Sequence, residues 1–188
     1  MKQRKGQTKR LLFRLSVKDV VPEIWRKFHT SSEITLAQLH SIVQVLMGWG
    51  DRHLYAFVIG AKRYSSPSDV DDDMENRNSI RTKLSKILGK GMNAIFYEYD
   101  FGDGWQINLV SEPIADGIHP NRFAECIEGS RRGPVEDSGG SRGYMEKSLI
   151  YRNPNHKRYR DIRELIGPDF DPEAFDLART NTMLKTIG

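Results

Sequence analysis

Hydrophobic and polar residues alternate along several short stretches of the chain, a pattern that predicts β-strands. The first two stretches run from about Leu11 to Val17 and over residues 23–31, and a loop near Val20–Pro22 would join them as a hairpin. A third strand is predicted over residues 53–64. Because both of its faces are apolar, we expect this strand to lie near the centre of a sheet.

The clearest alternation surrounds the sequence YEYDFGDGWQINLV, where Tyr97, Tyr99 and Phe101 share one face before a turn. Trp105 resumes the pattern after that turn. Glycines at positions 102 and 104 supply the positive φ angles that tight turns need. The stretch therefore predicts a β-hairpin whose four aromatic side chains help to build the core.

Other segments place apolar residues three and four positions apart, which is typical of helices. One helix is predicted to follow Thr35, its N-cap, and to end at Gly48, with His40 close to its buried face. A second, short helix is predicted over residues 79–89, with Ile80 among its inward-facing residues. The polar and acidic stretch before it predicts a surface loop over residues 65–78.

The C-terminal part of the chain changes character. Residues 113–143 are rich in proline and glycine and should pack over one side of the sheet, with one short strand at 123–129. Asp171 and Pro172 are predicted to start the last helix. Three helices are expected in this part, at residues 143–151, 157–167 and 172–187. Hairpin-connected strands mixed irregularly with helices predict an α+β fold: one domain with a small, mainly antiparallel sheet flanked by helices and a helical C-terminal region.

Composition narrows the class of protein. The chain has 188 residues, of which 38% are hydrophobic and 29% are charged, and this suits one domain with its own core. No apolar run has the length of a membrane span, and no apolar segment follows the basic N-terminus as in a secretory signal. We therefore expect a cytoplasmic protein. The single cysteine, Cys126, excludes an internal disulfide and a cysteine-based zinc cluster.

The net charge of +4 comes from the first ten residues, MKQRKGQTKR, which carry five basic side chains and no acidic one. The rest of the chain has 24 basic and 25 acidic residues. We therefore predict a disordered basic tail at residues 1–10 and a single domain at residues 11–188. Contacts of such a tail with phosphate groups carry no sequence specificity.

Five separated blocks carry a family resemblance: WRKF, TLAQLHSIVQVLMGW with HLYAF, YDFGDGW, CIEGSRRGPVEDSGGSRGY and DFDPEAFDL. In this order and spacing they resemble the plasmid pRiA4b ORF-3-like family over nearly the whole chain. The resemblance implies a shared fold and an association with plasmids and mobile elements, and some members carry a resolvase-like label. It implies no established activity.

The chain departs from this family pattern at two places. Ile107 stands where many members have a histidine, and Gly133 begins a Gly-Pro-Val-Glu-Asp run where many have Cys-Pro-Pro-Glu-Asp. If metal binding were the family's function, the loss of a histidine and a cysteine would weaken it in this chain.

Two kinds of catalysis are excluded by missing parts. The letters DFG that begin at Asp100 also occur in protein kinases, but the chain has no glycine-rich phosphate loop and no HRD-type catalytic loop. A serine recombinase needs a nucleophilic serine among arginines and a helix-turn-helix. Ser16 lies in a predicted strand, and the C-terminal helices lack the helix-turn-helix spacing.

A metal-binding or hydrolytic pocket is the sharpest enzyme hypothesis. Carboxylates combined with imidazoles suit a divalent cation that activates water, and no other cofactor is indicated. Each residue also has a structural alternative, such as hydrogen bonds from turn amides to Asp100 or a core position for His40. The candidate pocket residues are Asp100, Asp103, Trp105, Glu136, Asp137, His40 and His53.

Basic residues near aromatic ones raise a second hypothesis, contact with nucleic acid. Asp161 and Glu164 interrupt the basic run, so a solvated helix face is the alternative. The candidate contacts are Arg131, Arg132, Lys157, Arg158 and Arg160.

The third hypothesis is a non-catalytic binding or regulatory module that acts through a partner. It is preferred because the sequence holds no complete catalytic set, which argues against an enzyme. A nucleic-acid-binding accessory protein and a divalent-metal-dependent hydrolase are the two alternatives.

Overall fold

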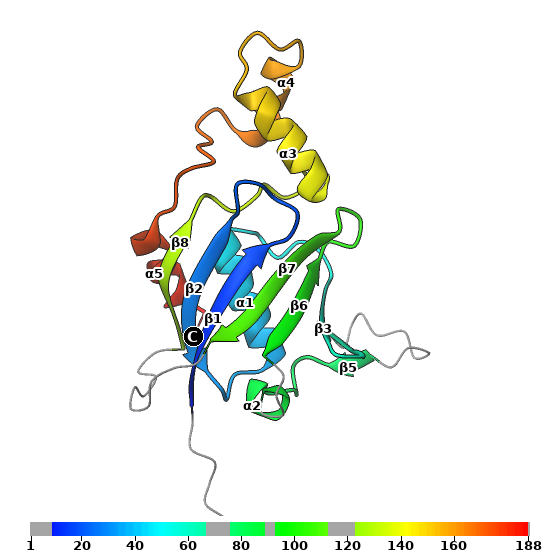
Figure 1. Cartoon of the computed structure of the whole chain (residues 1–188), viewed down its shortest axis with the longest axis vertical. Helices are drawn as coiled ribbons and strands as arrows, with labels where there is room; N and C mark the ends of the chain where they lie inside the picture. Colours follow the sequence, from blue (N-terminus) through cyan, green and yellow to red (C-terminus); the bar gives the residue numbers. More distant parts are fainter. Residues whose placement is uncertain (1–8, 67–75, 89–92, 113–122, 188) are drawn as a thin grey trace, which may run out of the picture.

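One eight-stranded sheet organises the protein (Figure 1). The structure is a computed structural model, and it describes residues 9–66, 76–88, 93–112 and 123–187. The strand order is β5-β4-β3-β6-β7-β1-β2-β8, and every pairing is antiparallel except the parallel pairing of β4 with β5. This arrangement confirms the predicted α+β class with its mainly antiparallel sheet.

The strands and helices have the following bounds. The strands are β1 (Arg10–Val17), β2 (Trp25–Ser31), β3 (Tyr55–Ile59), β4 (Lys62–Ser65), β5 (Asn76–Asn78), β6 (Ala94–Tyr99), β7 (Trp105–Glu112) and β8 (Ala124–Ser130). The helices are α1 (Leu36–Met47), α2 (Leu84–Ile87), α3 (Gly140–Tyr151), α4 (Tyr159–Ile166) and α5 (Leu177–Leu184).

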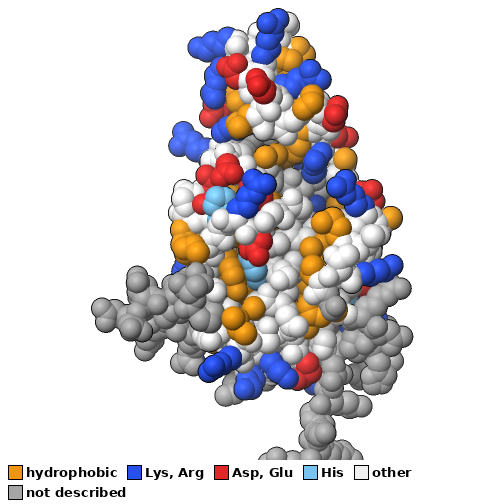
Figure 2. Space-filling view, turned by 180° about the vertical axis from the view of Figure 1, so that it is seen from behind, with side chains coloured by type: hydrophobic (Ala, Val, Ile, Leu, Met, Phe, Trp, Pro, Cys, Tyr) orange, Lys and Arg blue, Asp and Glu red, His pale blue; other side chains and the backbone are white. Residues whose placement is uncertain are grey.

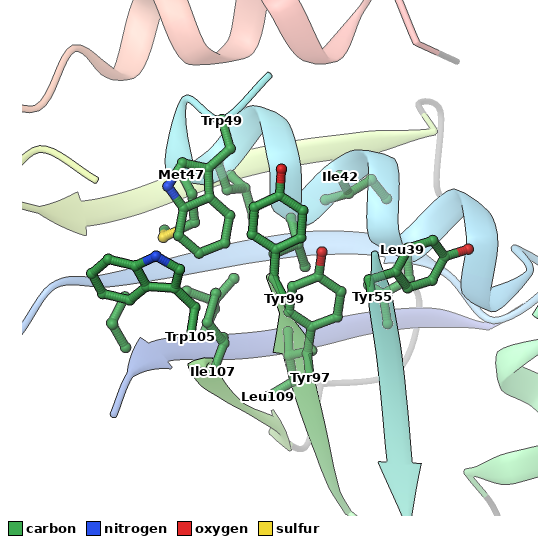
Figure 3. Close-up of a cluster of buried hydrophobic side chains, with 14 of the residues drawn as sticks. Leu39, Ile42, Met47, Trp49, Tyr55, Tyr97, Tyr99, Trp105, Ile107 and Leu109 are labelled. Carbon is green, nitrogen blue, oxygen red and sulfur yellow. The ribbon is translucent and has the colours of Figure 1, made fainter. Parts of the chain in front are cut away.

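Helix α1 packs on one face of the sheet and forms the core with it (Figure 3). Its start is fixed by a capping box, in which Thr35 Oγ1 accepts a hydrogen bond from the Gln38 amide and the Gln38 side chain accepts one from the Thr35 amide. Gly48 ends the helix in the left-handed conformation that glycine adopts without strain. Both predicted ends of α1 are therefore confirmed.

Three sheet predictions need correction. The strand predicted over residues 53–64 is a hairpin of β3 and β4, because Gly60 has a φ of 59° and reverses the chain there. Part of the predicted loop at 65–78 forms β5. Phe101 is 49% exposed and leaves the core, since the positive φ of 54° at Asp100 breaks the alternation just before it.

Two helix predictions also differ from the structure. The helix predicted over residues 79–89 is reduced to the four residues of α2, and Ile80 is 54% exposed instead of facing inward. The last helix begins at Leu177 rather than near Pro172. Asp176 is its N-cap, and its side chain accepts a hydrogen bond from the amide three residues later.

The C-terminal helices fall into two groups. Figure 1 shows α3 and α4 projecting from one end of the sheet, while α5 lies against β8 and also contacts α1. The Asn181 side chain donates to the carbonyl of Cys126 and accepts from its amide, as a neighbouring strand would. This contact covers part of the β8 edge, which is the kind of edge that otherwise pairs with other chains.

No helix in the described ranges is both long enough and apolar enough to cross a membrane. The predicted basic tail falls mostly on residues 1–8, which lie outside the described residues.

Candidate functional site

Asp100 uses its two carboxylate oxygens for different purposes. Its Oδ1 accepts hydrogen bonds from the amides of Gly102, at 3.1 Å, and Asp103, at 3.2 Å, and so ties the β6–β7 turn. Its Oδ2 lies 3.6 Å from Nε2 of His53. The side chain is largely buried, so one half of the carboxylate stabilises the turn and the other half faces a second loop.

Strand pairing brings His53 to this turn. Tyr55 of β3 lies opposite Tyr99 of β6 in an antiparallel register, so the residues before Tyr55 lie beside those after Tyr99. The Asp100 amide accordingly donates to the Leu54 carbonyl at 2.9 Å. The His53 ring meets the Tyr99 ring edge-on, with 5.7 Å between centroids, and this contact orients the imidazole toward Asp100.

Asp137 supplies the third group from the loop that precedes α3. Its Oδ1 lies 3.2 Å from Nε2 of His53. The side chain of Asp137 is 62% exposed and that of His53 is 27% exposed, so the cluster opens to solvent on the Asp137 side. One ligand atom from each of His53, Asp100 and Asp137 lies within 4.8 Å of the others.

The loop that carries Asp137 is held at several points. The Trp49 indole donates to the Pro134 carbonyl at 2.8 Å. Glu136 accepts from the Gly50 amide at 2.8 Å and from the Tyr99 hydroxyl at 2.6 Å. These anchors flank Asp137 but leave its own carboxylate free to face His53.

Close backbone approach explains the glycines of this loop. A Cβ atom at Gly133 would lie 1.9 Å from the carbonyl oxygen of Met47, and one at Gly140 would lie 2.2 Å from that of Asp103. Such distances exclude any side chain at either position without movement of the backbone. Of the segment predicted to pack over one side of the sheet, residues 113–122 lie outside the described residues and β8 joins the sheet itself. The part that follows β8 approaches the end of α1 at Gly133 and the β6–β7 turn at Gly140.

Tyr99 joins this loop to the strands below. Burial and the neighbouring Glu136 carboxylate both raise the pKa of the Tyr99 hydroxyl far above its ordinary value. The hydroxyl therefore stays protonated and donates to Glu136, while it accepts from the Arg52 amide at 3.0 Å. In the sequence Tyr99 is recognisable only as a core aromatic, and nothing there marks the role of its hydroxyl.

His40 belongs to a separate, buried network. Its Nδ1 lies 2.7 Å from the Tyr97 hydroxyl and its Nε2 lies 2.8 Å from Oδ1 of Asp51. Its ring also stacks on Tyr55 at 3.7 Å between centroids. The structure therefore gives His40 the role of a hydrogen-bonded core histidine, next to the cluster but outside it.

The remaining candidate pocket residues support the cluster from outside. Asp103 Oδ2 accepts from the Gly139 amide at 2.8 Å, which ties the hairpin turn to the start of α3. Trp105 is fully buried and lies between Trp49 and Tyr144. Figure 2 shows histidine surface next to acidic side chains on the face that carries these loops.

The five predicted nucleic-acid contacts do not form one surface. Arg131 is buried, and its guanidinium pairs with the carboxylate of Glu173. Arg132 lies over the ring of Phe170. The other three lie together at the α3–α4 end of the molecule and are exposed: Lys157, Arg158 and Arg160.

Comparison with known proteins places this architecture among related chains. The sequence model described as plasmid pRiA4b ORF-3-like protein matches residues 9–179. The uncharacterized protein y4hQ of Sinorhizobium fredii (strain NBRC 101917 / NGR234) is 28% identical over 175 residues, which are 93% of this chain and 90% of that protein. The crystal structure of MM3350, a protein of unknown function from Methanosarcina mazei Go1, is 31% identical, with a TM-score of 0.79 over 90% of this chain and 96% of that one.

Proposed function

The chain belongs to the plasmid pRiA4b ORF-3-like family, and within it we propose that this protein is a non-catalytic binding module that holds one divalent metal ion. The ion would be bound by Nε2 of His53 and one carboxylate oxygen each of Asp100 and Asp137. The observation that carries the proposal is the convergence of these three atoms from three separate loops. The relatives described above are themselves uncharacterised, so the proposal depends on the site.

The distances within the cluster suit a shared ion. Nitrogen and oxygen ligands lie about 2.1 Å from a first-row divalent metal, so neighbouring ligands are about 3.0 Å apart in octahedral and about 3.4 Å apart in tetrahedral geometry. The His53 nitrogen lies 3.2 Å from Asp137 and 3.6 Å from Asp100. Both separations fall close to these values.

The state of the His53 nitrogen also supports the proposal. Nε2 is buried and makes no hydrogen bond within the described part of the chain, although two carboxylate oxygens lie near it. An imidazole nitrogen that approaches oxygens without bonding to them is expected when all three atoms point at a common fourth atom. A buried polar nitrogen that makes no hydrogen bond is otherwise costly.

The ligand set narrows the choice of ion. One imidazole with two carboxylates suits Mn²⁺, Fe²⁺ or Zn²⁺ better than Ca²⁺, which takes six to eight oxygen ligands. Three protein ligands leave at least one coordination position open, as in sites that exchange a ligand. Because Asp137 lies on the exposed side of the cluster, that position would face solvent or a partner.

The open position also suits the alternative of a metal-dependent hydrolase, but the surrounding carboxylates favour binding. A hydrolase needs a general base within reach of the metal-bound water. Both oxygens of Glu136 accept hydrogen bonds from Tyr99 and Gly50, and one oxygen of Asp103 is engaged by Gly139. These two residues act as anchors of the loops, which supports a module that binds without catalysis.

Metal analysis of the full chain tests this function. Protein purified without chelators should contain close to one equivalent of a divalent metal, or should gain several degrees in Tm on addition of Mn²⁺ or Zn²⁺. Absence of bound metal together with no thermal shift would refute the proposal. Hydrolysis of p-nitrophenyl phosphate by the loaded protein, abolished by Asp100→Asn, would replace binding with the hydrolase alternative. Association with plasmids or mobile elements and a cytoplasmic location stay predictions from the sequence.

A further inference from the structure

The segment that holds α3 and α4 differs in charge from the rest of the chain. Residues 140–168 carry seven basic and three acidic side chains, a net charge of +4, which equals the net charge of the entire chain. Outside this segment and the basic N-terminus, acidic residues are therefore in excess. A projecting basic segment favours association with an anionic partner.

A groove of about 540 Å³ lies on this projection. Leu149 and Ile150 of α3 provide its apolar part, and His156, Lys157 and Arg158 provide its basic part. Glu146 also lines the groove and pairs with Arg158 at 3.1 Å, so among the described residues Lys157 is its unpaired cation. Leu149 is 70% exposed, the largest exposure among the large α3 and α4 hydrophobic side chains. The groove thus offers an apolar contact next to a cluster of cationic groups.

Hydrogen bonds within residues 153–159 hold the basic side of the groove in place. The His156 amide donates to the Asn153 carbonyl at 3.0 Å, and the Tyr159 amide donates to the His156 carbonyl at 2.9 Å. The Arg158 amide donates to Nδ1 of His156 at 3.1 Å. In the neutral ring this bond leaves the proton on Nε2, so His156 presents a donor of the kind that a carboxylate accepts.

The tyrosines of the projection argue against a nucleic-acid ligand. Binding of single strands depends on aromatic rings that stack on bases. The Tyr151 ring packs against Tyr159 and Phe170, and its hydroxyl donates to backbone carbonyls after α4. An exposed leucine beside cationic groups fits an acidic peptide with an aliphatic side chain better.

The chain itself contains such a peptide. Residues 69–75 have the sequence DVDDDME, with five acidic side chains, no basic one, and two apolar residues, Val70 and Met74. Strands β4 and β5, which flank this stretch, lie at the opposite end of the molecule from α3 and α4 (Figure 1). We propose that the groove of one copy binds residues 69–75 of a second copy, so that the protein associates head to tail.

Complementary variants of the full chain test this contact. Lys157→Glu with Arg158→Glu would reverse the groove's charge, and Asp71→Lys with Asp72→Lys would remove most of the negative charge of the acidic stretch. In sedimentation velocity at low ionic strength, the wild type should associate as concentration rises and return to monomer at about 0.5 M salt, where exposed charges are screened. Each double variant should stay monomeric.

Mixing the two double variants separates this contact from general charge effects. In the mixture only one variant has an intact groove and only the other has an intact acidic stretch, so it should form dimers and nothing larger. The wild type has both on every copy, so its head-to-tail contacts repeat and build larger rings or filaments. Arg160→Glu with Arg163→Glu is the matched control, because it changes the charge of the same projection outside the groove and should leave association unchanged.

A labelled peptide of residues 66–78 provides a second readout. It should bind the wild type and lose at least tenfold in affinity for the Lys157→Glu, Arg158→Glu variant. A chain that stays monomeric at low salt and does not bind the peptide would overturn the proposal. Binding of single-stranded DNA that this variant abolishes, without any binding of the peptide, would overturn it in favour of nucleic acid.

Discussion

Nε2 of His53 lies 3.2 Å from Oδ1 of Asp137. The two residues are far apart in the sequence, because His53 precedes β3 and Asp137 follows β8. Asp100, in the turn of that hairpin, completes the cluster. Each residue is placed by a different device: strand register for His53, turn amides for Asp100, and a loop held by Glu136 for Asp137. Such independent support is what a preorganised binding site requires.

Asp100→Asn should separate the two roles of this residue. Asparagine keeps an oxygen for the turn amides and tolerates the φ of 54°, so the Tm should change by no more than about 2 °C. The loss of the negative charge should weaken metal binding by at least about tenfold. Asp100→Ala should lose both functions, with a drop in Tm as well. Equal effects of the two substitutions on the Tm, measured by calorimetry, would contradict the separation.

Tyr99→Phe should affect metal binding from outside the cluster. It removes the hydroxyl that donates to Glu136 and so loosens the loop that carries Asp137. We expect a loss of about 1–2 kcal/mol in unfolding free energy and a tenfold or greater loss in metal affinity. Tyr55→Phe is the matched control, because its hydroxyl contacts Ser79 elsewhere in the core. Metal affinity equal in both variants would show that the Glu136 contact does not position Asp137.

Arg26→Met should destabilise the fold strongly. The Arg26 guanidinium is buried, which lowers its pKa to about 10 but leaves it charged at pH 7. It donates to the carbonyls of Leu46 and Arg131, among others. These bonds join the end of α1 to the start of the loop that carries Asp137. Chemical denaturation should show a loss of roughly 3 kcal/mol or more, since buried acceptors lose charged donors.

Lys27→Met is the control for Arg26. Its side chain points to the opposite face of β2 and makes a half-exposed ion pair with Glu112 at 3.3 Å. Such pairs contribute no more than about 1 kcal/mol. Similar losses of unfolding free energy in Arg26→Met and Lys27→Met would show that the buried hydrogen bonds of Arg26 do not stabilise the fold more than an exposed ion pair does.

Cys126 should be almost inert toward thiol reagents in the native state. Burial raises the pKa of the Cys126 thiol to about 11. At pH 8 the thiolate fraction is then about a hundredfold lower than in the unfolded chain, so alkylation by iodoacetamide should be slower by at least that factor. Fast alkylation of native protein would contradict the burial of the thiol.

The raised pKa of Cys126 also makes the free energy of unfolding depend on pH. Since the folded pKa lies above the unfolded one, the contribution of Cys126 is fully present below pH 9 and is lost as the pH rises toward 11. Cys126→Ala should remove this part of the pH dependence. The measurement that checks this is the unfolding free energy of the wild type and of Cys126→Ala by chemical denaturation between pH 9 and pH 11.

Local patterns were sufficient for the β1–β2 and β6–β7 hairpins and for α1. The β6–β7 hairpin follows from period-two alternation on both sides of a glycine turn, and α1 follows from Thr35 and Gly48 at its ends. The predictions failed where one backbone angle decided the outcome. Gly60 divides a continuous apolar run into two strands, and the positive φ at Asp100 turns Phe101 outward. Neither conformation is visible in the alternation of residue types.

The candidate site was only partly predictable. His53, Asp100 and Asp137 were all among the seven candidate residues because of their chemistry, but residue types do not show which ones meet. Their convergence depends on the β3–β6 register and on the anchors of the Asp137 loop, which are long-range contacts. His40 was equally plausible by chemistry, and only its burial beside Tyr97 and Asp51 separates it from the cluster.

The central claim is tested most directly by titrating Mn²⁺ into the full chain and measuring free Mn²⁺ by electron paramagnetic resonance. The wild type should bind one equivalent, and His53→Gln and Asp137→Asn should each weaken binding by at least about tenfold. His156→Gln, which changes a histidine of the α3–α4 projection outside the cluster, should bind as the wild type does. If the wild type binds no Mn²⁺, or if His53→Gln binds it equally well, the cluster is not a metal site.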